Sequence, residues 1–107
     1  MITEVSNDTT YAFTRENPVR VGGAADMEGP LNERRYLASI AGPGGEEITF
    51  TRVGSCCHFE TPNGVLGGGL LDLYRITWRG AKDSLDLYIN MYDPGYLMAP
   101  AGLSIRK

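Results

Sequence analysis

The sequence of 107 residues lacks most features that mark a known class of protein. No apolar run approaches the roughly 18 residues of a membrane-spanning helix. Residues 1–10 hold no basic start followed by an apolar stretch, which a signal peptide requires. The chain is also too short for a (β/α)8 barrel, which needs about 200 residues or more. We therefore expect a single domain over residues 1–107, with residues 1–9 as a loose N-terminal segment.

An excess of positive charge is lacking too. Ten Lys and Arg stand against thirteen Asp and Glu, which gives a net charge of −3. A mildly acidic surface repels a phosphate backbone, so we expect no nucleic-acid partner. The one basic pair, Arg34-Arg35, reads most simply as solvated charge, and we keep both residues as candidate contacts for a protein partner.

Cysteine and histidine are scarce and lie together at Cys56, Cys57 and His58. Adjacent cysteines cannot close a long loop, so they are no disulfide scaffold of the secreted kind. Neighbouring side chains of an extended chain point to opposite faces, so we expect no metal site and no cofactor here. The simplest interpretation packs one cysteine in the core and places the other at a tight bend.

Two alternatives stay open for the same cluster. A cysteine nucleophile could be activated by His58, but Cys56 and His58 would lie roughly 6.5–7 Å apart along a straight strand, so the chain would have to bend. A strained vicinal disulfide would act as a redox switch. These three residues are the candidate catalytic residues of the chain.

Motifs for phosphate and acid–base chemistry are absent. Gly67-Gly68-Gly69 is followed by leucines rather than by the Gly-Lys-Ser/Thr of a phosphate-binding loop, and we expect a flexible loop or a bulge there. No paired-carboxylate motif and no G-x-S-x-G occurs. We expect Asp72, Asp86 and Asp93 to be solvated charges.

What the chain does have is alternation typical of strands. Period-two patterns over residues 71–79 and 85–92, separated by a short polar turn, predict an antiparallel hairpin. A β-rich run covers residues 48–59, and Thr61-Pro62-Asn63-Gly64 predicts a turn. The tyrosines of the second hairpin strand indicate that its outer face is partly covered.

Residues 32–41 predict one short helix, capped by Asn32 and ended by Gly42-Pro43. A strand is the competing prediction, because Tyr36, Ala38 and Ile40 also alternate. The fold class is therefore α+β, a small domain dominated by an antiparallel sheet with one short helix. Tyr88 and Tyr92 are candidate binding residues, since aromatic side chains anchor interfaces well, and Asn63 in the predicted turn is a further candidate.

Six strings of the chain are distinctive as a set: ENPVRVGG at 16–23, GPLNERRYL at 29–37, GSCC at 54–57, TPNG at 61–64, GGGLLD at 67–72 and LYINMY at 87–92. With these strings the chain resembles a family of small bacterial lipoproteins of unestablished function, often labelled 2-dehydro-3-deoxyphosphooctonate aldolase. The similarity covers about residues 11–105 and contributes no catalytic residue. It implies export to the periplasm or cell surface with a lipid anchor, whereas a chain complete as given would be cytoplasmic.

The chain lacks recognisable motifs for acid–base catalysis, metal binding and phosphate binding, and its composition is acidic. These two features together favour a non-enzymatic binding module. We expect it to recognise a protein or a component of the cell envelope, for example as an inhibitor or immunity-type partner of a basic protein. The alternative is a cysteine-dependent enzyme or thiol redox protein that uses Cys56, Cys57 and His58. The sequence does not set the oligomeric state.

Overall fold

The computed structural model describes residues 2–107. The main sheet has four strands in the order β1-β5-β4-β3, and β2 pairs with β6 in a second sheet. β1 and β5 are parallel, and the other neighbours are antiparallel. The elements in chain order are β1 Val19–Arg20, η1 Ala24–Asp26, α1 Gly29–Ala38, β2 Ile40–Ala41, β3 Ile48–Val65, β4 Gly68–Trp78, β5 Leu85–Asn90 and β6 Ser104–Ile105.

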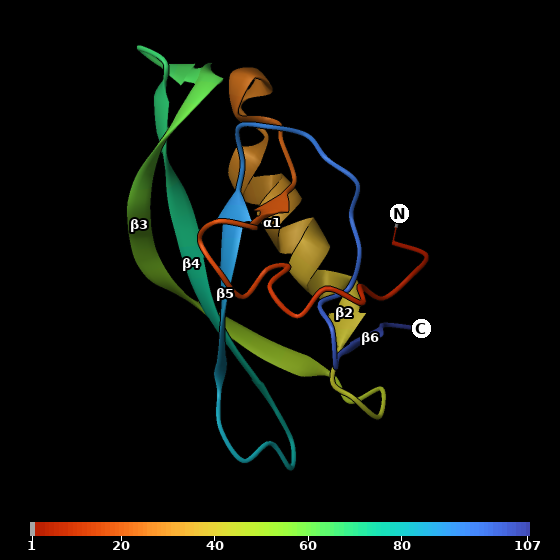
Figure 1. Ribbon diagram of the computed structural model, residues 1–107. Coiled ribbons are helices and arrows are strands. Elements are labelled where there is room, and N and C mark those ends of the chain that lie inside the picture. The colour runs from red at the N-terminus through yellow and green to blue at the C-terminus, as the bar shows by residue number, and fades with distance from the viewer. Residues whose placement is uncertain (1) are drawn as a thin grey trace.

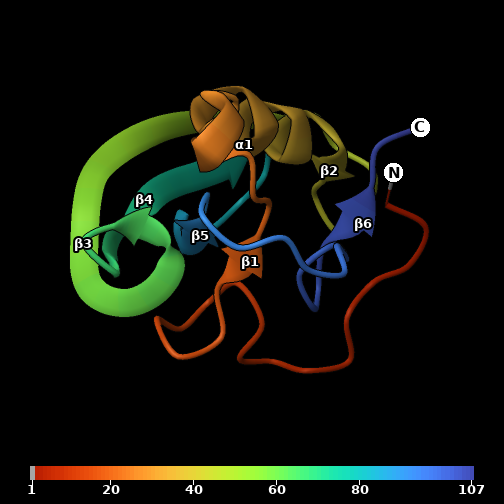
Figure 2. The same ribbon diagram turned by 90° about the horizontal axis from the view of Figure 1, so that it is seen from above.

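The α+β class with a mainly antiparallel sheet is confirmed at this level of description. Strands β3 and β4 curve strongly, and α1 packs across their concave side (Figures 1 and 2). Within the described residues, no helix has both the length and the apolar character needed to cross a bilayer.

The helix lies three residues earlier than predicted, over Gly29–Ala38 rather than 32–41. Pro30 accounts for the early start, because its fixed φ suits the first turn and its missing N–H needs no partner there. Asn32 therefore lies inside the helix and does not cap it, and its side chain donates to the carbonyl of Gly22 at 3.1 Å. The competing strand prediction holds only for Ile40–Ala41, which form β2.

The β4–β5 hairpin agrees with the alternation of the sequence. The register pairs Ile76 with Leu85 and Tyr74 with Leu87. Ile76, Leu87 and Ile89 are fully buried and form the centre of the core. The face of β5 that carries Tyr88 is partly covered as expected, because Tyr88 is half-buried and Asn90 is buried. At the edge of the strand, turns at residues 10–14 pass alongside, and the carbonyl of Ala12 accepts a hydrogen bond from the amide of Tyr88 at 2.8 Å.

β3 is one of the two edge strands of the main sheet, and its register is irregular. Its register against β4 shifts at three places, between Arg52 and Gly54, between Cys56 and His58, and between Glu60 and Val65. Bulges of this kind bend a strand and increase its twist. They account for the curl of β3, which bends around β4 in Figure 2.

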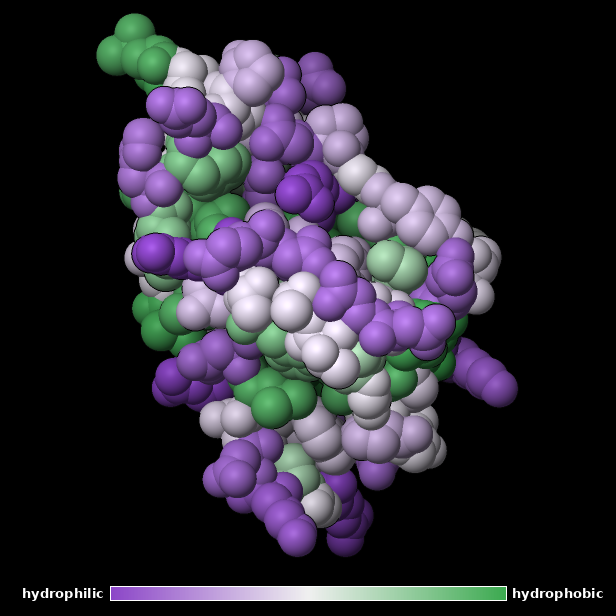
Figure 3. Space-filling model, viewed as in Figure 1, coloured by the Kyte–Doolittle hydropathy of each residue, from purple (hydrophilic) through white to green (hydrophobic). Residues whose placement is uncertain are grey.

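The turn of this arm is not where the sequence places it. Residues 61–64 form an irregular segment within β3, and Leu66 and Gly67 make the turn. Both turn residues have positive φ, 54° and 77°, as in the tight turns that suit the twist of a hairpin. Gly68 and Gly69, expected in a loop, begin β4. Val65 is 83% exposed and Leu66 is fully exposed, so the arm ends in the apolar tip seen at the upper left of Figure 3.

A carboxylate ties the arm to the end of β5. Asp93 accepts hydrogen bonds from the side chains of Thr61 at 2.6 Å, Asn63 at 2.8 Å and Asn90 at 2.9 Å. Burial opposes ionisation of Asp93, but the three donated hydrogen bonds outweigh it and hold its pKa below the usual range. Asp93 is thus a structural tether rather than a freely solvated charge.

The N-terminal segment, which we expected to be loose, is held at residues 4–6. The amide of Ser6 donates to the carbonyl of Ala99 at 2.8 Å, and the amide of Ala99 donates to the carbonyl of Glu4 at 3.0 Å. Ile2 is buried in the core. These contacts fix the N-terminal residues beside the segment that precedes β6.

Candidate functional site

Cys56 and Cys57 form a disulfide with each other, their Cα atoms 3.7 Å apart. The expectation that their side chains point to opposite faces is therefore wrong. Its premise was a regular strand, whereas the register shifts between Cys56 and His58 and Cys57 has a φ of 61°, in the left-handed region. The bulge breaks the alternation of side chains at this point, and the minor alternative of a vicinal disulfide is the one that the structure contains.

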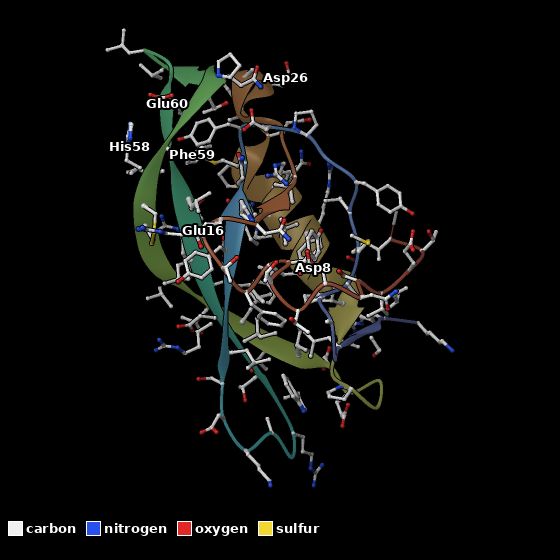
Figure 4. All side chains as sticks on the ribbon, in the orientation of Figure 1. Asp8, Glu16, Asp26, His58, Phe59 and Glu60 are labelled. Carbon is white, nitrogen blue, oxygen red and sulfur yellow. A yellow bond between two sulfur atoms is a disulfide. The ribbon has the colours of Figure 1, made fainter. Side chains whose placement is uncertain are left out.

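His58 does not join the two sulfurs in a closed reactive centre. Figure 4 shows its imidazole projecting outward from β3, while Phe59 points inward, where its ring meets that of Tyr92 edge to face at 5.9 Å. Cys57 and His58 line a shallow cavity of about 300 Å³ together with Arg15 and Glu16. Both sulfurs are bonded, so this state presents no thiolate nucleophile. No group of three metal-binding side chains was found within residues 2–107.

The five candidate binding residues separate into different places. Arg34 and Tyr92 line one cavity, whereas Arg35 lines another on the far side of the helix. Asn63 belongs to the tether of Asp93. Tyr88 is half-buried beneath the loop that contains Ala12. Only the first two therefore contribute to a common site.

That common site, which we call the carboxyl cavity, lies between α1 and the inner side of the β3–β4 arm. Its volume is about 420 Å³, within the usual range of ligand pockets. Its polar lining residues are Glu33, Arg34, Arg52, Ser55, Asp72 and Tyr74. Its less polar walls are Pro30, Leu70, Met91 and Tyr92.

Glu33 is the most unusual of these residues, because it is a carboxyl group in the core and only 1% exposed. It lies on the inner face of α1, where Tyr74 of β4 donates a hydrogen bond to its Oε1 at 3.0 Å. Its Oε2 has no hydrogen-bond partner among residues 2–107. A buried carboxylate oxygen without a donor costs folding free energy, so Oε2 needs a proton or a ligand.

Asp72 is the charged neighbour of Glu33 and is only 6% exposed, contrary to the expectation of a solvated charge. Arg52 donates to Asp72 Oδ1 at 2.8 Å and to the hydroxyl of Ser55 at 2.9 Å. The side chain of Arg52 is 49% exposed and that of Asp72 is 9% exposed, so the ion pair joins a solvent-exposed cation to a buried carboxylate. The ion pair thus places a positive charge directly at Oδ1 of Asp72.

These surroundings favour the protonated form of Glu33. Burial, followed by hydrogen bonding and charge repulsion from Asp72, raises the pKa of Glu33 to about 8. Two ionised carboxylates accept hydrogen bonds but cannot donate one to each other. When Glu33 is protonated, its O–H can donate to the carboxylate of Asp72. Burial and the neighbouring Glu33 also raise the pKa of Tyr74 to about 12, so the tyrosine stays a donor.

Strongly shifted carboxyl groups in a cavity are typical of functional sites. Glu33 was not among the residues selected from the sequence, although its spacing signals it. Glu33, Tyr36 and Leu37 recur at i, i+3 and i+4, which places the carboxyl group on the buried stripe of the helix.

A scan against models of protein families and searches of curated proteins and of solved structures all found no match to this chain. The carboxyl cavity itself is thus the basis for assigning a function.

Proposed function

We propose that the protein is a non-enzymatic binding module that recognises a basic segment of a partner protein through the carboxyl cavity. The observation that carries this proposal is the buried carboxyl group of Glu33, whose Oε2 lacks a donor among the described residues. A partner that brings a hydrogen-bond donor with positive charge would satisfy this oxygen and the adjacent Asp72 at once.

The charge of the whole domain supports the same kind of partner. Its net charge of −3 attracts a basic protein and speeds the encounter. A cavity of about 420 Å³ has room for one long side chain, while a surrounding surface would contact the rest of the segment. By its resemblance to exported lipoproteins, we further propose that the partner meets the domain at the cell envelope.

The test is a titration of ¹⁵N-labelled protein with a blocked hexalysine peptide, followed by amide chemical shifts. We expect the largest shifts at Glu33, Arg34, Asp72 and Tyr92, because these residues line the cavity. A hexalysine peptide with acetylated side chains should cause none of them. Shifts elsewhere on the surface, or equal shifts with the acetylated peptide, would contradict binding in the cavity. Glu60→Gln is the matched control, since it removes an exposed carboxylate from the same arm.

The vicinal disulfide favours thiol–disulfide exchange as a second candidate function. A partner dithiol would transfer two electrons and two protons, leaving Cys56 and Cys57 as thiols and the partner as a disulfide. Both cysteines are half-buried and Cys57 lines an open cavity, so the bond is within reach of such a partner.

Labelling with iodoacetamide separates this candidate from a purely structural disulfide. For exchange in the native fold, mass spectrometry should find no label before treatment with dithiothreitol and two labels after it, without unfolding. Labels that appear only in denaturant would refute the redox function.

A further inference from the structure

We infer that the group taken up by the carboxyl cavity is a primary ammonium, as at the end of a lysine side chain, and that it enters in exchange for the proton shared by Glu33 and Asp72. This inference rests on the proposed function and names the chemistry of its ligand. It follows from the acceptors that the cavity leaves open, from the balance of charge inside it and from the size of the group.

The open acceptor is Glu33 Oε2, on the inner face of the helix. Tyr74 donates to Glu33 Oε1 and Arg52 donates to Asp72 Oδ1, whereas Glu33 Oε2 has no donor among the described residues. An ammonium is a compact charge with three donors, so one group can bond to Oε2 and to the carboxylate of Asp72, which lines the same cavity. A guanidinium carries five donors in a rigid plane, and a buried position beside one open oxygen would leave most of them unpaired.

No cation is bonded to Glu33 among the described residues. The charged and titratable groups that line the cavity with it are Asp72, Arg52, Tyr74, Tyr92 and Arg34. Arg52 forms its ion pair with Asp72 at 2.8 Å, and no ion pair joins Arg34 to Glu33. An ionised Glu33 would therefore be a buried charge without a bonded counter-charge. A proton on Glu33 removes that charge in the free protein, and an ammonium compensates it in the complex.

The exchange fixes how binding depends on pH. The pKa of Glu33 is about 8, whereas a lysine ammonium keeps its proton up to about pH 10. Below the pKa of Glu33, each bound ammonium must release one proton. Affinity should therefore rise by roughly fifty-fold or more between about pH 6 and pH 8.5 and change little above that range.

Met91 lines the cavity together with Glu33. Its side chain also packs against the start of the helix, where a Cβ on Gly29 would lie 2.7 Å from the sulfur. Methionine is unbranched, has three rotatable bonds and adapts readily to a new neighbour, so the proposed entry of a slender alkylammonium requires a change of rotamer rather than of backbone.

The experiment is isothermal titration calorimetry at about pH 7 in phosphate and in MOPS, which contain no primary amine and whose different ionisation enthalpies count released protons. The probes are blocked hexalysine, blocked hexaarginine and free n-butylamine. We expect release of about one proton per site with hexalysine and none with hexaarginine. Release with n-butylamine as well would assign the site to amines in general, and release with hexalysine alone would assign it to a lysine held within a protein segment.

Two variants test the ammonium exchange separately from the proposed binding function. Glu33→Gln mimics the protonated carboxyl group, so it should fold, release no proton and bind hexalysine at least tenfold more weakly. Glu60→Gln should behave as the wild-type protein. Amide shifts in the cavity without proton release, or equal release with hexaarginine, would overturn the ammonium exchange and leave the binding module in place. Absence of cavity shifts with every peptide would instead overturn the proposed function.

Discussion

Glu33→Gln is expected to stabilise the protein at about pH 8.5 by a few kcal/mol, since one pKa unit corresponds to about 1.4 kcal/mol. In the unfolded chain Glu33 has its ordinary pKa of 4.5, and in the folded protein its pKa is about 8. Between these values the folded state binds more protons than the unfolded state, so the free energy of unfolding falls as pH rises. Glutamine stays neutral at every pH and avoids this loss.

Urea denaturation of both proteins from about pH 5 to pH 9 measures the effect. The two stabilities should be similar near pH 5 and should separate as pH rises toward 8. Subtracting the wild-type curve from the variant curve removes the contributions of the other titrating groups. A difference that does not change with pH would show that Glu33 ionises normally in the folded protein. The expected gain also means that Glu33 lowers stability at neutral pH, as is usual for residues retained for function.

Leu87→Ala is expected to destabilise the protein by about 2–5 kcal/mol, the range for removing most of a buried leucine side chain. Leu87 is 0% exposed and lies on β5, between β1 and β4 in the sheet. The alanine would leave a cavity that the flanking strands cannot close, because both are fixed by backbone hydrogen bonds. Urea denaturation at constant pH measures this loss.

Val65→Ala is the matched control for this substitution. Val65 is 83% exposed at the tip of the arm, so its truncation should change stability by no more than about 0.5 kcal/mol. If Leu87→Ala lowered the free energy of unfolding as little as Val65→Ala, then β5 would not be at the centre of the core.

The sequence predicts the parts of the fold that depend on local alternation. Tyr74 and Ile76 fall on the buried face of β4 as expected, because one-sided burial imposes a period of two. The same parity applies to Asp72, but its place near the start of the strand predicts a solvated charge, and this prediction is wrong. No local pattern could show its partner, because Arg52 lies 20 residues away on another strand.

The remaining errors come from features without a local signal. The bulge at Cys57 is set by how two long strands fit together, and it brings the adjacent sulfurs onto one side. The start of α1 depends on Pro30 and on the close approach of Gly29 to Met91, 62 residues further along the chain. The carboxyl cavity likewise forms only when the helix meets the arm. The periodicity of the sequence indicates that Glu33 and Asp72 are on buried faces. It does not predict that the two side chains line the same cavity.

The three register shifts of β3 also bear on how the protein avoids aggregation. A straight edge strand of 18 residues would offer a long row of unpaired amide and carbonyl groups to a second molecule. Each bulge interrupts that row and twists the next stretch out of line with it. No flat stretch of the outer edge is then long enough to template a foreign strand, so this arm can be both long and exposed without seeding fibrils.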